Sequence, residues 1–155
     1  FPAAESGRGT RLYVRDVAGT TKARAVSPEG YSLFRGTVTP DGKSVTVSGP
    51  DQRIYLYAVQ GGEPTAFPGL TSGHRPIRWA PDGRSLFVQE ANKEPMQVFK
   101  YDVATGRLEL WKQVLPADAA GLAGSSRFVV TPDGRYYAYS YLRVLSYLQL
   151  VEGLK

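Results

Sequence analysis

Residues 39–47 read TPDGKSVTV, and two close copies of this stretch follow, APDGRSLFV at residues 80–88 and TPDGRYYAY at residues 131–139. Proline presets the backbone of a turn, aspartate accepts hydrogen bonds from its own turn, and glycine tolerates a positive φ angle. After each glycine an apolar or aromatic residue stands at nearly every second position, which is the period of a β-strand. Each copy therefore predicts a tight turn that leads into a strand.

The copies recur at a nearly constant spacing. Their aspartates, Asp41, Asp82 and Asp133, are 41 and 51 residues apart. A second strand-like motif, RLYVRDV, RIYLYAV, QVFKYDV and YLQLVEG, begins at positions 11, 53, 97 and 147, with steps of 42, 44 and 50 residues. Four short antiparallel strands repeated every ~40 to 50 residues are typical of a β-propeller blade. We therefore expect an all-β fold, a partial β-propeller of four-stranded antiparallel blades.

The repeats divide the chain into blades. We expect residues 1–10 to be an N-terminal extension or cut linker and residues 11–155 to form the partial propeller. The sequence SPEG at residues 27–30 lies too close to Asp41 to open a blade, so we expect a loop there. The predicted units are a half blade at 11–26, full blades at 35–67 and 76–112, and a three-stranded last blade at 126–151.

Two full blades with incomplete first and last blades do not close a ring, which needs at least about four blades. We therefore expect further blades before Phe1. An arc separated from them exposes unpaired strand edges and apolar blade faces, and both favour association.

The motifs resemble a known family. The sequence RWAPDGRSLFV at residues 78–88, with YDVATGR at residues 101–107, resembles the TolB-like propeller repeat, a bacterial relative of the tryptophan-aspartate repeat. The stretch TPDGRYYAYSYLRVLSYLQLVEGLK at residues 131–155 resembles the end of the C-terminal sensor propellers of bacterial eukaryotic-like serine/threonine kinases. The first resemblance implies the fold of residues 11–155. The second implies a membrane-tethered signalling parent and an extracytoplasmic location.

The composition is that of an ordinary globular domain, with 155 residues of which 42% are hydrophobic. Apolar runs are only a few residues long, far short of the roughly 20 that cross a bilayer, so we expect no membrane span in this chain. Cysteine is absent, which excludes disulfides and thiolate metal sites. The 19 Lys and Arg residues exceed the 14 Asp and Glu residues, which gives a net charge of +5. The basic residues are scattered along the chain, a pattern that argues against nucleic-acid binding.

Candidate catalytic and metal-binding residues are few. His74 is the only histidine, and no second ligand stands at metal-binding spacing, so we expect no metal and no cofactor. The sequence has no nucleophile-elbow motif, no phosphate-binding loop before a helix and no kinase motif. Asp41, Asp82 and Asp133 are attributed to turns rather than to a carboxylate cluster. We expect no catalytic residues and no enzymatic activity in this chain.

The longer connections between the predicted strands meet at one end of the blades. Long loops on a rigid scaffold are where recognition usually lies. The predicted connections are residues 49–52, 69–75, 91–95, 115–125 and 142–145. Among them we expect His74, Arg75, Lys93 and Arg143 to form a basic rim for an anionic or peptide partner; outside such a role, His74 is expected to be a solvated loop residue.

These features favour a non-catalytic module for protein interaction or ligand sensing, with a protein, a peptide or a small anionic ligand as its partner. We expect it to be the C-terminal part of a larger bacterial signalling protein such as a membrane-tethered serine/threonine kinase. The alternative is part of a propeller-containing hydrolase or peptidase, which would need carboxylates, histidines or a metal converging at the axis. A pure assembly scaffold is a third interpretation.

The first prediction concerns self-association. Because the predicted arc has open edges and apolar faces, the isolated chain should associate edge to edge or face to face. Light scattering coupled to size-exclusion chromatography measures this directly. A stable monomer at high protein concentration would contradict the prediction.

Overall fold

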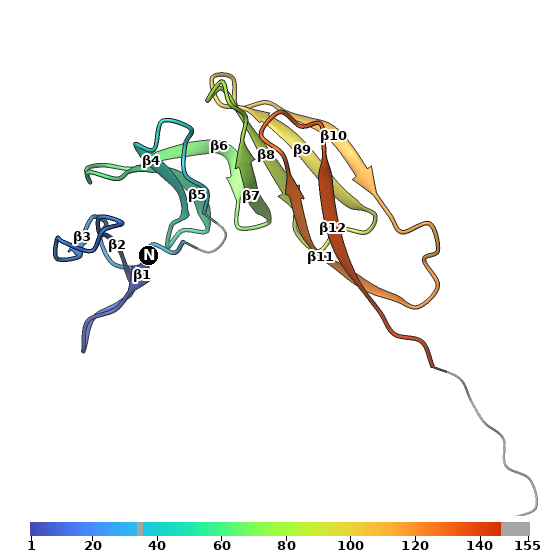
Figure 1. The fold of residues 1–155 in the computed structure, drawn as a ribbon, viewed down its shortest axis with the longest axis horizontal. Helices are drawn as coiled ribbons and strands as arrows, with labels where there is room; N and C mark the ends of the chain where they lie inside the picture. Colours follow the sequence, from blue (N-terminus) through green and yellow to red (C-terminus); the bar gives the residue numbers. More distant parts are fainter. Residues whose placement is uncertain (34–35, 147–155) are drawn as a thin grey trace, which may run out of the picture.

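The computed structural model describes residues 1–33 and 36–146, and these residues form strands, turns and bends without a helix. Their strands are arranged in four antiparallel sheets. The sheets follow one another along an arch in chain order (Figure 1). The fold is a partial β-propeller, as the repeat predicts.

The third sheet is a complete blade. It contains β7 (His74–Trp79), β8 (Ser85–Glu90), β9 (Met96–Asp102) and β10 (Leu108–Val114), in the spatial order β10-β9-β8-β7. Each strand is therefore hydrogen-bonded to its neighbours in the chain, and β7 and β10 form the two edges. This is the four-stranded unit that the repeat predicts.

The second sheet departs from the predicted blade at its first strand. It contains β4 (Ser44–Ser48), β5 (Arg53–Ala58) and β6 (Thr65–Thr71). The predicted strand from residue 35 is replaced, in the described residues, by two isolated bridges, Ser32 to Ser48 and Val38 to Val45. The Thr37 amide donates to the Thr46 hydroxyl at 2.8 Å instead of to a backbone carbonyl, which interrupts the ladder between the two bridges. The chain also approaches β4 closely at Gly36, where a Cβ atom would lie 2.4 Å from the Thr46 carbonyl oxygen.

The first sheet corrects the prediction for residues 1–10. Pro2–Ala3 forms β1, which pairs with β2 (Arg11–Val14) instead of standing apart as an extension. The α-amino group of Phe1 also donates a 2.9 Å hydrogen bond to the Tyr13 carbonyl. The third strand of this sheet is β3 (Arg24–Ala25).

The predicted loop at SPEG is present and is fixed by its first residue. Ser27 is buried, and its Oγ accepts a 2.8 Å hydrogen bond from the Leu12 amide. The same hydroxyl donates to the Pro28 carbonyl at 2.8 Å. This loop therefore packs against β2 rather than starting a blade.

The last sheet begins earlier than predicted. In the described residues it contains β11 (Leu122–Val130) and β12 (Tyr137–Arg143). β11 starts before residue 126 because residues 122–125 continue the ladder, with Leu122 opposite Arg143 and two register shifts along the pair. The predicted connection at 115–125 is correspondingly shorter. The predicted third strand, at residues 147–151, lies outside the described residues.

The three PDG turns have nearly the same hydrogen bonds. Gly42 donates its amide to the Thr39 carbonyl at 2.9 Å, and Lys43 donates to the carboxylate of Asp41 at 3.0 Å. The corresponding amide-to-carboxylate bonds at Asp82 and Asp133 measure 2.9 and 3.1 Å. The three glycines have φ angles of 65 to 71°. The structure confirms the turns predicted from the sequence.

Apolar side chains fill each interface between neighbouring sheets. Burial of one large apolar side chain contributes about 1.5 to 3 kcal/mol, so these interfaces supply much of the stability. The first interface joins Leu12 to Val47 and Tyr57, the second joins Ile54, Phe67 and Leu70 to Trp79, Leu86, Val88 and Tyr101, and the third joins Phe87, Met96, Val98 and Val114 to Phe128 and Val130.

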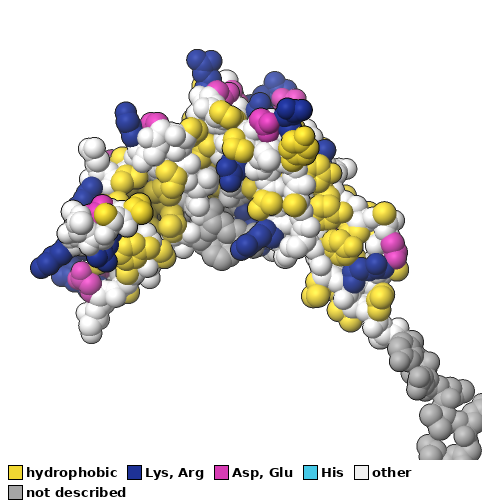
Figure 2. Space-filling view, in the orientation of Figure 1, with side chains coloured by type: hydrophobic (Ala, Val, Ile, Leu, Met, Phe, Trp, Pro, Cys, Tyr) yellow, Lys and Arg dark blue, Asp and Glu magenta, His cyan; other side chains and the backbone are white. Residues whose placement is uncertain are grey.

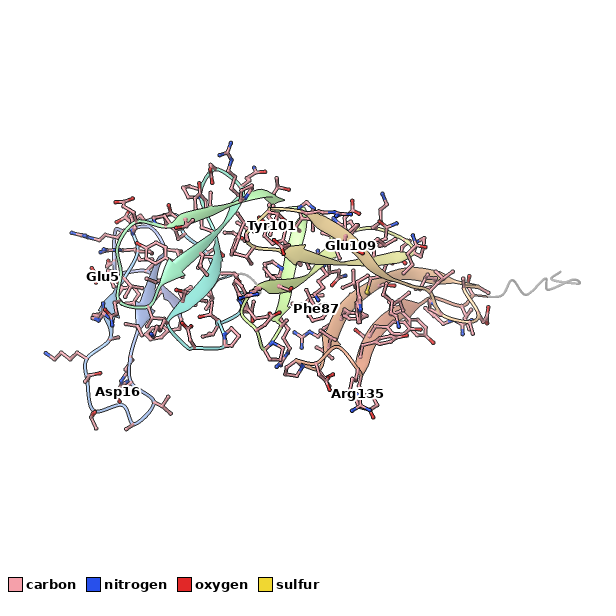
Figure 3. The ribbon with its side chains drawn as sticks, turned by 90° about the horizontal axis from the view of Figure 1, so that it is seen from above. Glu5, Asp16, Phe87, Tyr101, Glu109 and Arg135 are labelled. Carbon is pink, nitrogen blue, oxygen red and sulfur yellow. The ribbon has the colours of Figure 1, made fainter. Side chains whose placement is uncertain are left out.

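The two faces of the complete blade are both covered. Along β8, Leu86 and Val88 face the second sheet, whereas Phe87 faces the last sheet. Figure 3 shows Tyr101 on the side of β6 and Phe87 on the side of β11 and β12. The Tyr101 hydroxyl donates a 3.0 Å hydrogen bond to the Pro68 carbonyl, which ties β9 to the second sheet.

A glycine substitution tests the repeated turn. Gly83 has φ +65° with open space around its missing Cβ, so Gly83→Ala should lower the free energy of unfolding by about 1 kcal/mol through backbone strain alone. The matched control is Gly73→Ala in another turn, where φ lies outside the positive region and alanine should be neutral or slightly stabilising. Urea denaturation of both variants measures the difference, and equal effects would contradict this account of the turn.

The turn carboxylates also predict how stability depends on pH. The Thr39 hydroxyl and then the Lys43 amide hold the pKa of Asp41 below its ordinary value of 3.8. The Thr131 hydroxyl and then the Arg135 amide lower the pKa of Asp133 in the same way. A lowered folded-state pKa means that the folded protein binds fewer protons than the unfolded chain. The stabilisation is therefore complete above the ordinary carboxyl pKa and is lost as the pH falls through the folded-state value.

The double variant Asp41→Asn/Asp133→Asn should reduce this acid sensitivity, because asparagine keeps the turn but does not titrate. Denaturation midpoints recorded from about pH 7 to about pH 2 measure it. An acid slope as steep as that of the unsubstituted protein would show that these carboxylates are not responsible.

Candidate functional site

A cleft lies on the inner side of the arch, between the first strands of the last two sheets. Strands β7 and β11 contact each other there, and the cleft between them has a volume of about 260 Å³. Its lining consists of Gly36, residues 75–78 of β7, Gln89 of β8 and residues 127–130 of β11. The candidate site is therefore built on strands of the scaffold rather than on loops.

Three arginines border this cleft. Arg75 and Arg78 come from β7, and Arg127 comes from β11. Among the described residues, none of the three forms an ion pair or a side-chain hydrogen bond, in contrast to Arg11, Arg53 and Arg143. The lining contains no carboxylate. Figure 2 shows Lys and Arg side chains on the hollowed inner side of the arch.

Gln89 is the one buried polar side chain in the cleft lining. It is 3% exposed, and its side-chain amide has no hydrogen-bond partner among the described residues. Gln89 lies opposite Arg75 in β7 and Val98 in β9. Cross-strand neighbours share a face of the sheet, so Gln89 faces the last sheet together with Phe87. Among the described residues, the one buried side-chain nitrogen or oxygen atom without a hydrogen-bond partner is Trp79 Nε1. The Gln89 amide is therefore not sealed in the core but reaches the open space of the cleft.

A β-bulge in β7 determines how the arginines are presented. The register with β8 shifts between Pro76 and Arg78, so that Arg78 lies opposite Phe87. Such a bulge places an extra residue in one strand and turns the next side chain. Arg78 thus faces the last sheet, as Arg75 does, while Ile77 packs against the core between the two sheets.

The four residues of the predicted basic rim all lie at the same end of the blades, the end opposite the PDG turns. His74 starts β7 and Arg143 ends β12, and both were expected in loops. The pairing of His74 with Glu90 and of Leu122 with Arg143 extends the strands to these positions. Lys93 lies in the connection between β8 and β9, as expected.

The rim residues have different surroundings. Arg143 pairs with Asp118 and donates to the Ala120 carbonyl, so it holds the connection before β11. Lys93 lies 3.9 Å from the carboxylate of Glu90. Of the four, only Arg75 lines the cleft. The rim as a joint binding surface stays a prediction.

His74 is half-buried in its strand rather than solvated in a loop. Its Nδ1 accepts a hydrogen bond of 3.2 Å from the Thr71 amide. Burial lowers the pKa of His74, and the neighbouring Glu90 carboxylate acts in the opposite direction. Desolvation therefore favours the neutral imidazole, which makes His74 a poor permanent cation for the rim.

Two arginines and Gln89 were not among the predicted site residues. Arg78 and Arg127 lie beside residues of the turn and strand motifs, and these motifs predict structure rather than binding. A usable signal for Gln89 was its strand register, since the alternation in residues 85–90 places it on the same face as Phe87. What the sequence does not specify is that both faces of this strand are covered.

The described residues contain no group of three or more His, Asp or Glu side chains arranged to hold a metal ion. Asp41, Asp82 and Asp133 each serve their own turn. Within the described ranges, no helix is long and apolar enough to cross a membrane.

Similar structures support the fold. TolB from Acinetobacter baumannii superposes with a TM-score of 0.62 at 18% identity, covering 89% of this chain and 33% of that chain. A structure assigned as TolB from Agrobacterium tumefaciens gives a TM-score of 0.56 at 18% identity, covering 89% of this chain and 52% of that chain. The chain thus spans about a third to a half of these neighbours. No protein-family model and no curated protein sequence matches it.

Proposed function

We propose that this chain is a non-catalytic protein-interaction module whose recognition surface includes the cleft between β7 and β11. One observation carries the proposal: the three arginines and the Gln89 amide that line this cleft have no partner among the described residues, and the lining holds no carboxylate. Arg143, by contrast, pairs with Asp118. Polar side chains that have no protein partner in a cleft are available to bind another molecule.

The chemistry of the lining supports binding rather than turnover. General acid-base catalysis needs a group that exchanges a proton near neutral pH. Arginine stays protonated, and glutamine does not titrate. The other lining residues are glycine, proline and apolar residues. A hydrolase or peptidase remains the alternative from another class, and no feature of the cleft favours it.

The proposal extends to the parent protein. The resemblance of residues 131–155 to the end of a kinase sensor propeller supports a larger bacterial signalling protein, such as a membrane-tethered serine/threonine kinase. In that protein the module would lie outside the cytoplasm and report the binding of a partner. This finer proposal rests on sequence resemblance alone.

Selection from a displayed peptide library tests the proposed function. The chain should enrich peptides that share one motif and compete with one another for a single site, because a strand-built cleft is rigid. Turnover should be absent on a panel of peptide and glycoside substrates, with the metal content of the protein measured in parallel. Failure of the selected peptides to converge, or turnover on the panel, would contradict the proposal.

A further inference from the structure

We infer that the cleft between β7 and β11 is a carboxylate-binding subsite, which takes an acidic side chain from an extended segment of a protein partner. Arg75 and Arg78 supply the charge, and Gln89 supplies a hydrogen bond from the cleft wall. This inference rests on the proposed function and specifies the chemistry of its partner.

Gln89 is the observation that points to a ligand. Gln89 lies at the border of the core on β8: Val88 before it and Val98 across from it are buried and apolar, whereas Arg75 across from it in β7 is charged. Its amide borders the cleft without a protein partner among the described residues, so a ligand there can take the hydrogen bonds that water otherwise makes. The amide becomes useful once a ligand in the cleft accepts its N–H. A carboxylate oxygen is an acceptor of this kind.

The arginines specify the charge of that ligand. Arg75 lies opposite Gln89 in the β7–β8 ladder, and the bulge turns Arg78 to the same face. A guanidinium group binds a carboxylate with two parallel hydrogen bonds, and neither arginine has a competing partner among the described residues. Arg127 borders the cleft from β11, so positive charge stands on both walls.

The size of the cleft favours a side chain over a whole small molecule. Its volume of about 260 Å³ falls below the ~300 to 1,000 Å³ of pockets that enclose drug-sized ligands. The cleft runs along the inner edge of β7, a strand that pairs only with β8 in the described residues. An extended segment lying along this edge can place one acidic side chain in the cleft.

Fluorescence anisotropy with labelled, capped peptides tests the inference. A peptide of alternating Glu and Ser should bind the unsubstituted chain, and the same peptide with Gln in place of Glu should bind at least about tenfold more weakly, since each hydrogen bond to a charged group contributes about a tenfold factor. Glutarate serves as the free dicarboxylate. Competition by glutarate at concentrations close to those of the peptide would overturn the choice of a protein segment.

Two double variants that remove the same charge distinguish binding at this cleft from general electrostatic attraction to the protein. Arg75→Gln/Arg78→Gln should weaken binding of the Glu peptide by more than about tenfold. Arg84→Gln/Arg107→Gln removes the same charge near the PDG turn and the turn before β10 and should change affinity less than about twofold. Equal losses in both double variants would overturn the inference.

The variant Gln89→Met distinguishes a role of Gln89 in binding from a role in structure. Methionine keeps the length of the side chain and removes the amide. The melting temperature should stay the same or rise while affinity for the Glu peptide falls about tenfold. A lower melting temperature with unchanged affinity would assign Gln89 to structure and overturn its role here.

The peptide library separates this inference from the proposed function. If the selected peptides share one motif that is not acidic, and their affinity is unchanged in these variants, the proposed function stands and the carboxylate subsite is wrong.

Discussion

The architecture depends on the need of each small sheet to bury two apolar faces. In β8, Leu86 and Val88 face one neighbouring sheet and Phe87 faces the other, so the blade is covered only when sheets pack on both sides. Face-to-face stacking of twisted sheets along an arc meets this need. The same stacking brings the first strands of successive blades to the inner side, where β7 meets β11. The cleft is a consequence of the packing that stabilises the fold.

Much of this fold could be predicted from the sequence, because its signals are local. The Pro-Asp-Gly turns and the alternation after them depend on a few adjacent residues, and the structure places the predicted hydrogen bonds at Asp41, Asp82 and Asp133. The spacing of these turns then predicts the blades. The structure confirms the complete four-stranded sheet of β7 to β10.

The differences arise where distant contacts decide the outcome. The strand pairing of Pro2 and the close packing of Gly36 on Thr46 depend on partners several residues or more away. The cleft was missed for a similar reason. Arg75 was predicted as a loop residue, whereas strand pairing and a bulge place it beside Arg78. The burial of Gln89 depends on β11 covering the second face of β8, which its alternating pattern does not specify.

The account leads from packing to recognition through Gln89, a largely buried residue whose amide borders the arginine-lined cleft. The most direct measurement is the side-chain amide signal of Gln89 in a nitrogen-15 correlation spectrum, assigned by comparison with Gln89→Met. On titration with an acidic peptide, this signal should shift in step with binding, and its hydrogens should exchange more slowly with water. A signal that stays unchanged while amides elsewhere respond would contradict the account.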